Sequence, residues 1–179
     1  MTGAGRDGKV KLERVGSAEQ IAEVAALAKE IWRLHYVPIV GAEQVEYMLD
    51  RFQSAEAIAR QIAEAGYEYH LARGAGYLGL AADVAKKKML LSKIYVRESL
   101  RGTGLGRAMT ELAERRAAER GCGELWLTVN VNNSGSIAFY ERMGFGKTGR
   151  LVQDIGGGYV MDDWRMAKAV AARKYGGAG

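Results

Sequence analysis

The sequence has few of the residues that build disulfides and metal sites. Its 179 residues include one cysteine, two histidines and one proline. Cys122 alone excludes an intramolecular disulfide, and Cys122 with His35 and His70 gives no ligand spacing typical of zinc, so we expect no metal. The N-terminus lacks the apolar core of a signal peptide, and no apolar run approaches the roughly 18 residues of a membrane span. We therefore expect a cytoplasmic protein with no membrane partner.

The sequence also lacks a strong predominance of Lys and Arg over acidic residues. Lys and Arg total 26 against 21 Asp and Glu, a formal net charge of +5 at pH 7, and acidic residues are mixed through most segments. Because a nucleic-acid-binding face needs Lys and Arg gathered with little acid between them, we expect no nucleic-acid partner. The positive excess suits an anionic ligand.

The length and composition are those of one globular domain. A chain of 179 residues is close to the usual domain size of about 150, and 48% hydrophobic with 26% charged residues is typical of a folded protein. We expect a flexible N-terminus over residues 1–8, a single domain over residues 9–170 and a flexible tail over residues 171–179.

Hydrophobic periodicity predicts a mixed α/β order of elements. A capping box at Ser17 and Gln20 starts the first helix, which we expect to end near Pro38. Further helices are predicted around residues 45–52, 54–62, 105–121 and 133–143. Strands are predicted over residues 9–15, 67–73, 77–84, 89–96 and 125–131, with two more around Leu151 and Val160. The three strands between residues 67 and 96 are expected to be antiparallel.

Glycine, in contrast, is abundant, and three of the 24 glycines lie in one turn. Gly102, Gly104 and Gly106 stand between a predicted strand and a predicted helix, where glycine allows positive φ and lets backbone amides approach a ligand. The N-terminal end of the following helix favours an anion, so the turn predicts a phosphate site. A dinucleotide-binding fingerprint is excluded, because it would need glycine or alanine at Arg107.

Three segments, in order, resemble the GNAT superfamily of N-acetyltransferases. They are Leu91–Val96, Arg101–Gly106 and Asn133–Phe145. The resemblance implies a mixed, mostly antiparallel sheet of about seven strands, flanked by helices and splayed between the fourth and fifth strands. It also implies acetyl-CoA as cosubstrate, with the strand paired to pantetheine, the glycine turn around the pyrophosphate and a tyrosine near the thioester sulfur.

The resemblance implies a set of residues that bind the coenzyme. They are Ile94, Tyr95, Val96, Arg101, Gly102, Thr103, Gly104, Leu105, Gly106, Arg107, Asn133, Ser136 and Tyr140. Arg101 and Arg107 could pair with phosphate, although either could also be a solvated surface charge. Asn133 is equally explained as the cap of the helix that follows it.

Tyr140 is the expected catalytic residue. An alkylammonium with a pKa of about 10.4 must lose a proton before it attacks a thioester, and the departing thiolate must gain one. A phenol with a pKa of about 10 beside the sulfur can donate that proton. Without the surrounding motif, a tyrosine on an amphipathic helix would be read as a core residue. The general base cannot be named from the sequence.

A narrower set of segments resembles the bacterial spermidine/spermine-type N-acetyltransferases and their uncharacterised relatives. These segments are Ile31–Tyr36, Gln44–Leu49, Phe52–Ser54 and Gly158–Asp163. They imply an acceptor site whose carboxylates attract a cationic amine, formed by Tyr36, Glu46, Tyr47, Asp162 and Asp163. Each carboxylate could equally be a solvated surface group, and His35 is expected to be a hydrogen-bonded core residue rather than a base.

We therefore predict an N-acetyltransferase that moves an acetyl group from acetyl-CoA to a primary amine by direct transfer. A covalent intermediate on Cys122 has no sequence support. The acceptor could be a polyamine, another small amine or a protein amino group. A different class stays open, namely a non-catalytic acyl-CoA-binding sensor or regulatory module. The expected partner is a small-molecule amine, and a homodimer is also open.

Overall fold

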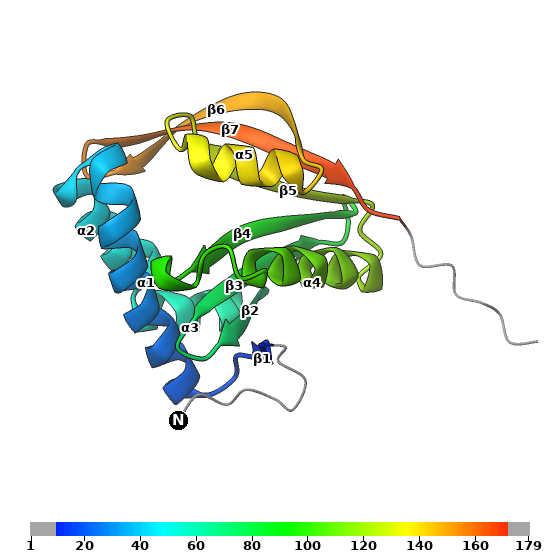
Figure 1. Ribbon diagram of the computed structural model, residues 1–179, viewed down its shortest axis with the longest axis horizontal. Coiled ribbons are helices and arrows are strands. Elements are labelled where there is room, and N and C mark those ends of the chain that lie inside the picture. The colour runs from blue at the N-terminus through cyan, green and yellow to red at the C-terminus, as the bar shows by residue number, and fades with distance from the viewer. Residues whose placement is uncertain (1–9, 172–179) are drawn as a thin grey trace, which may run out of the picture.

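The computed structural model describes residues 10–171 (Figure 1), so the ends expected to be flexible, residues 1–8 and 171–179, lie outside the described residues except at residue 171. The elements in chain order are β1 (Glu13–Arg14), α1 (Ala18–Val40), α2 (Ala42–Gln53), α3 (Ala55–Glu64), β2 (Tyr67–Ala72), β3 (Gly76–Asp83), β4 (Lys88–Val96), a 3-10 turn (Glu98–Leu100), α4 (Leu105–Glu119), β5 (Glu124–Asn130), α5 (Ser134–Arg142), β6 (Gly146–Gly156) and β7 (Tyr159–Ala169). The predicted order of helices and strands is confirmed.

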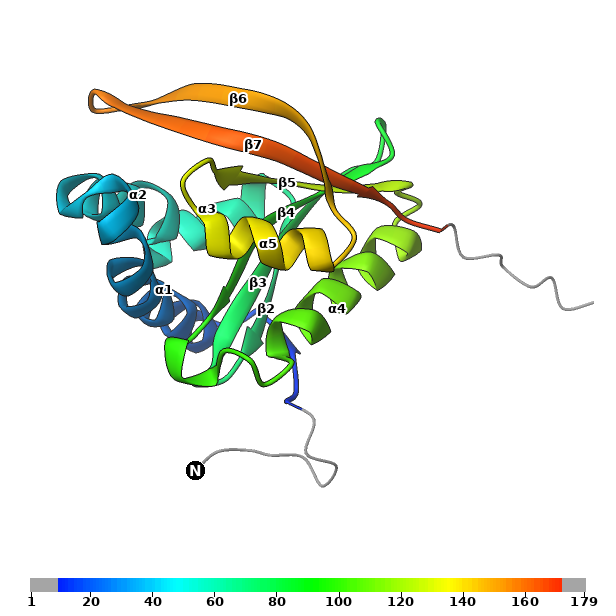
Figure 2. The same ribbon diagram turned by 45° about the horizontal axis from the view of Figure 1, so that its top comes forward.

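The strands form one seven-stranded sheet in the order β1-β2-β3-β4-β5-β7-β6. All neighbouring strands are antiparallel except β4 and β5, which are parallel. Successive side chains on a strand point to opposite faces, so Tyr77 packs with α1, α2 and α3 while Leu78 packs with α4 and α5. Each face of the sheet therefore has its own hydrophobic cluster under its own group of helices (Figures 1 and 2). The predicted mixed, mostly antiparallel fold is confirmed.

The first strand is shorter than predicted. The first strand is limited to Glu13 and Arg14, because only these two residues pair with β2. Helix α1 begins at the predicted capping box but continues past Pro38 to Val40. Proline in the last turn removes a single backbone hydrogen bond, and the amide of Gly41 still donates to the carbonyl of Val37. The helix ends at Gly41, whose φ of +88° is left-handed.

The sheet is splayed between β4 and β5, as expected. The two strands pair only from Lys88 to Leu90 and from Glu124 to Trp126. Beyond these residues they separate, and a bulge at Ser92 in the β3–β4 ladder accompanies the change in direction. The edge of β4 from Leu91 to Val96 therefore lacks a cross-strand partner on the β5 side. This opening determines where a ligand can enter the sheet.

Within residues 10–171, no helix combines the length and apolar character that crossing a membrane would require.

Candidate active site

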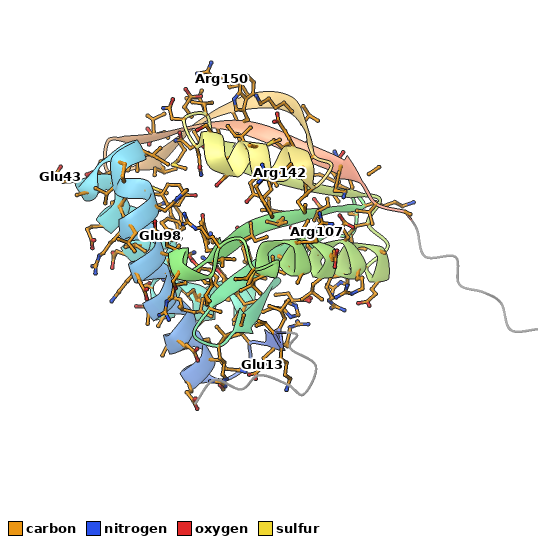
Figure 3. All side chains as sticks on the ribbon, in the orientation of Figure 1. Glu13, Glu43, Glu98, Arg107, Arg142 and Arg150 are labelled. Carbon is orange, nitrogen blue, oxygen red and sulfur yellow. The ribbon has the colours of Figure 1, made fainter. Side chains whose placement is uncertain are left out.

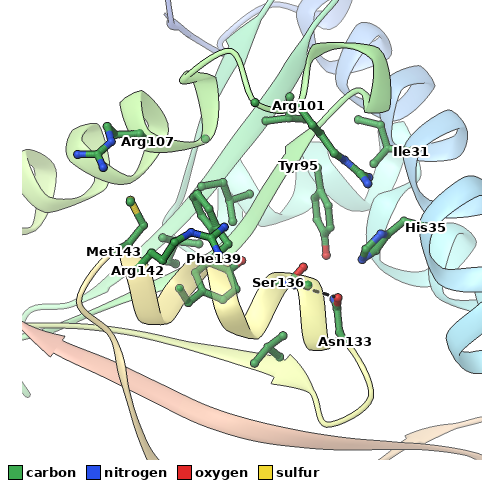
Figure 4. A pocket seen from close by; sticks show the side chains of 18 of the residues that line it. Ile31, His35, Tyr95, Arg101, Arg107, Asn133, Ser136, Phe139, Arg142 and Met143 are labelled. Atoms are coloured by element: carbon green, nitrogen blue, oxygen red, sulfur yellow. Dashed lines mark hydrogen bonds between the residues drawn. The ribbon is translucent and has the colours of Figure 1, made fainter.

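A cleft with a volume of about 540 Å³ lies where β4 and β5 separate (Figure 4). Its walls come from α1, β4, the turn before α4, β5 and α5. The cleft brings together eleven of the thirteen residues expected to bind the coenzyme; the exceptions are Thr103 and Leu105. The Thr103 hydroxyl donates to the carbonyl of Leu100, and Leu105, the first residue of α4, is buried. Both stabilise the glycine turn rather than face the cleft.

The glycine turn places free backbone amides at one end of the cleft. Gly102 and Gly104 have φ angles of +79° and +90°, and a Cβ at either position would meet no atom within 4 Å. Glycine is needed there for its backbone conformation. Gly104 caps α4, so the first amides of the helix have no intrahelical partner. At Gly106 a Cβ would lie 3.1 Å from the Phe139 ring, so glycine there lets α4 and α5 approach closely.

Three arginines add positive charge to the cleft, and Arg101 extends towards His35 (Figure 4). Arg101, Arg107 and Arg142 all line the cleft, and within residues 10–171 none has a carboxylate at ion-pair distance. Figure 3 shows Arg107 and Arg142 on the facing sides of α4 and α5. Amides at a helix N-terminus with unpaired guanidinium groups form a site suited to phosphate. Arg142 was not among the residues expected from the sequence, although its spacing of three residues from Phe139 places both on one helix face.

Tyr140 lies on α5 with its ring in the core and is 8% exposed. The ring packs edge-on against Phe139 and Phe145, with centroids 5.5 and 5.7 Å away. Burial raises the pKa of the Tyr140 hydroxyl well above its ordinary value of 10, and no hydrogen bond to it is found within residues 10–171. The phenol therefore keeps its proton at neutral pH, and Tyr140 lines the cleft.

Asn133 and β4 form the middle of the cleft. The Asn133 side chain is 3% exposed, and its oxygen accepts a hydrogen bond from the Ser136 amide at 3.4 Å (Figure 4). The cap predicted for α5 is confirmed. Ile94, Tyr95 and Val96 lie on the unpaired part of β4, where alternate backbone groups are open to a ligand.

His35 and Tyr36, near the C-terminal end of α1, form a further wall of the cleft. The Tyr36 hydroxyl is 3.0 Å from the hydroxyl of Tyr95, and burial raises the pKa of Tyr36. His35 is half-buried and lines the cleft rather than the core, which corrects the expectation for it. Burial and the charge of Arg101 lower the pKa of His35, so its imidazole is neutral at pH 7.

The residues expected to bind the amine are not gathered at one place. Two of the three carboxylates expected at the acceptor site are held by arginines: Glu46 by Arg33 at 2.7 Å, and Asp162 by Arg150 at 2.8 Å. Neither lines the cleft. Tyr47 donates to the carbonyl of Ile155 and so attaches the β6–β7 hairpin to α2. Tyr36 lines the cleft, and Asp163 is buried behind it.

No metal site accompanies the cleft: across residues 10–171, no three His, Cys, Asp or Glu side chains come close enough to hold an ion.

Comparison with known proteins places the chain among acetyltransferases. Streptothricin acetyltransferase of Streptomyces lavendulae is 32% identical over 96 residues, which are 54% of this chain and 49% of that protein. The chain thus spans about half the length of this curated relative.

Two solved structures share the fold. One is PaiA N-acetyltransferase of Thermoplasma acidophilum in complex with coenzyme A, with a TM-score of 0.68 and 21% identity over 89% of this chain and 99% of that one. The other is a spermidine N-acetyltransferase chimera from Vibrio cholerae, with a TM-score of 0.64 and 18% identity over 89% and 94%. The model of the acetyltransferase (GNAT) family matches residues 26–145. The chain belongs to this family of acetyl-CoA-dependent N-acetyltransferases.

Proposed function

We propose that this protein transfers an acetyl group from acetyl-CoA directly to the primary amine of a small molecule. The observation that carries the proposal is the Tyr140 side chain, whose hydroxyl has no hydrogen bond within residues 10–171, in a cleft that also presents helix amides and three arginines. Acetyl-CoA supplies a reactive thioester. The protein's own residues bind the anionic part, orient the acetyl group and supply a proton.

The cleft fits a coenzyme with a diphosphate group. Amides after Gly104 and the guanidinium groups of Arg101, Arg107 and Arg142 would hold the phosphates. Unpaired backbone groups between Ile94 and Val96 would orient the chain that bears the thioester, and one amide there would stabilise negative charge on the carbonyl oxygen. Tyr140 would then protonate the leaving thiolate.

Direct transfer is favoured over a covalent intermediate on the protein. The sole cysteine, Cys122, is buried near the C-terminal end of α4 and does not line the cleft. Burial raises the pKa of its thiol, so the nucleophilic thiolate is scarce at neutral pH.

Arg142→Ala is expected to raise the KM for acetyl-CoA about tenfold, with kcat changed less than twofold. The reason is the loss of one charge-assisted contact to phosphate, which is not specific to the transition state. The matched control is Arg60→Ala, because Arg60 lies on the exposed face of α3 and within residues 10–171 pairs only with Glu56. Steady-state kinetics at low and high salt would check this, since salt should reduce the difference. An unchanged KM would remove Arg142 from the phosphate site.

For the acceptor, we propose a small amine recognised through one ammonium group. A polyamine is the acceptor that the narrower resemblance implies. Near the cleft, the carboxylates of Asp163 and of Glu98, whose charge acts on His35, have no ion pair with an arginine within residues 10–171. The likeness to spermidine N-acetyltransferase, at 18% identity, shows the fold alone. A polycation would bind more tightly than a monocation only if several free carboxylates were available. Glu46 and Asp162 are already paired with arginines, so this advantage is reduced.

A panel of acceptors would test this proposal. It would contain spermidine, spermine, butylamine, benzylamine, lysine, a lysine-containing peptide and streptothricin, each assayed by thiol release at two salt concentrations. We expect a monoamine to match or exceed spermidine in kcat/KM, with little dependence on salt. A polyamine rate that is highest and falls with salt would establish the polyamine reading. Preference for the peptide would favour a protein acceptor, and coenzyme binding without thiol release from any amine would favour the sensor.

A further inference from the structure

The wall of the cleft contains one side chain that can accept a proton at neutral pH. Within residues 10–171, no Asp or Glu lines the cleft. Its ionisable side chains are three tyrosines, three arginines and one histidine, namely Tyr36, Tyr95, Tyr140, Arg101, Arg107, Arg142 and His35. A guanidinium group is a donor only, and burial raises the pKa of all three phenols, so they stay protonated. The imidazole of His35 is therefore the only base in the cleft wall that these residues form.

His35 and Tyr140 face the same cleft from different helices, His35 from α1 and Tyr140 from α5. Figure 4 shows His35 extending from α1 towards the space that Tyr95 and Ser136 also face. The His35 ring packs edge-on against Tyr36, with centroids 4.8 Å apart, and the Tyr36 hydroxyl lies 3.0 Å from that of Tyr95. Ser136 and Tyr140 are four residues apart on α5, so they share one face of that helix. A base and an acid therefore border one space.

The two histidines of the chain have different surroundings. His70 is buried on β2 and lies 2.7 Å from Glu68, which Arg116 also binds, so it belongs to an ion-pair cluster. His35 is half-buried, and in the described part of the chain its ring has no carboxylate at ion-pair distance. A histidine that keeps contact with solvent and is outside any ion pair can gain and lose a proton in each turnover.

The charges around His35 keep its imidazole unprotonated between turnovers. Burial and the charge of Arg101 lower its pKa from the ordinary 6.5, and Asn133 and the charge of Glu98 offset part of this change. The uncharged polar groups that face the same space come from α1, β4 and the start of α5, and are Tyr36, Tyr95 and Asn133. A neutral imidazole can accept a proton, and the imidazolium that forms beside Arg101 is repelled by it and readily loses that proton.

We propose that His35 is the general base of the reaction and takes a proton from the acceptor ammonium, a role that rests on the proposed function. The neutral amine then attacks the acetyl carbonyl and forms the C–N bond. The C–S bond breaks with its electron pair left on sulfur, Tyr140 gives its proton to the sulfur, and the second amine proton passes to the Tyr140 oxygen. His35 finally releases its proton to solvent, so both side chains regain their starting states.

The pH dependence of kcat/KM tests this role, with the panel amine that has the highest rate. The wild type should show a plateau around neutral pH and a fall at a pH below 6.5, where His35 becomes protonated. His35→Gln must instead capture the small fraction of amine that is already neutral. Its kcat/KM should be at least about tenfold lower at pH 7 and should rise with pH towards the wild-type value as the amine loses its own proton.

An acceptor that needs no base gives a second comparison. Trifluoroethylamine resembles a short alkylamine, but its fluorine atoms withdraw electrons and lower the pKa of the nitrogen, so it is already neutral at pH 8. His35→Gln should acetylate this amine within about twofold of the wild-type rate, although it loses about tenfold or more with butylamine. A structural defect in the cleft would lower the two rates by the same factor.

Three controls separate this role from a structural one. His35→Asn should give the same profile as His35→Gln, so the test does not depend on the folding of one variant. His70→Gln replaces the other histidine, which lies outside the cleft. It should keep the fall below pH 6.5 even if the loss of its contact with Glu68 lowers the thermal midpoint. The affinity for acetyl-CoA, measured by calorimetry, should be unchanged in all three variants.

Two results would overturn the proposal while leaving the acetyltransferase intact. One is a wild-type pH profile in folded His35→Gln, which would mean that another group or water deprotonates the amine. The other is an equal loss of rate with butylamine and trifluoroethylamine, which would make His35 a structural residue. Failure of the proposed function is seen differently, because the wild type itself would then release no thiol with any panel amine.

Discussion

Replacing Tyr140 by phenylalanine is expected to lower kcat about 10²-fold or more while leaving the affinity for acetyl-CoA nearly unchanged. Phenylalanine keeps the ring and its packing against Phe139 and Phe145 and removes only the hydroxyl. Because no hydrogen bond to that hydroxyl is found within residues 10–171, its removal leaves no buried group unpaired. The folded state should therefore be as stable as the wild type.

Single-turnover and steady-state assays, with calorimetry for coenzyme binding, would check the Tyr140 prediction. The matched control is Tyr69→Phe, which removes a hydroxyl that donates to Gln61 inside the other hydrophobic cluster. That control should lower the thermal midpoint and leave kcat close to normal. Normal turnover in Tyr140→Phe would instead show that water or another group protonates the thiolate.

Gly104→Val is expected to weaken binding of acetyl-CoA by more than tenfold. Gly104 has a φ of +90°, which a β-branched residue adopts only at a large energetic cost. A Cβ there would meet no protein atom within 4 Å, so the added methyl groups would occupy space that the phosphates need. The expected change is therefore in the dissociation constant, measured by calorimetry on folded protein.

A second glycine at the other end of the same helix provides the matched control for strain. Gly121 follows α4 with a φ of +71°, and a Cβ there would also meet no atom within 4 Å. Gly121→Val should therefore lower stability by a similar amount and leave coenzyme affinity unchanged. Equal affinities in the two variants would mean that the turn before α4 does not hold the phosphates.

The sequence was most informative where local patterns determine structure. The capping box at Ser17, the cap at Asn133 and the positive φ angles of Gly102 and Gly104 all depend on residues a few positions away. Motif order then led to the fold and to the residues that line the cleft around Tyr140.

The sequence was least informative where a role depends on distant partners. Glu46 and Asp162 were expected to attract an amine, yet Arg33 and Arg150, from 13 and 12 residues away in the chain, bind them. Arg142 and His35 face the cleft only because β4 and β5 separate. No short pattern reports such contacts, because they depend on how whole elements pack against one another.

The short parallel pairing of β4 and β5 also affects the mechanics of the sheet. A continuous ladder stiffens a sheet along its full width, but here β1–β4 and β5–β7 share only three register pairs, at one end. The two halves of the sheet are therefore joined mainly at that end and by the common hydrophobic cluster under α4 and α5. A ligand that formed hydrogen bonds to the open edges of both β4 and β5 would hold the two halves of the sheet together. A tighter ligand should therefore also make the molecule more rigid.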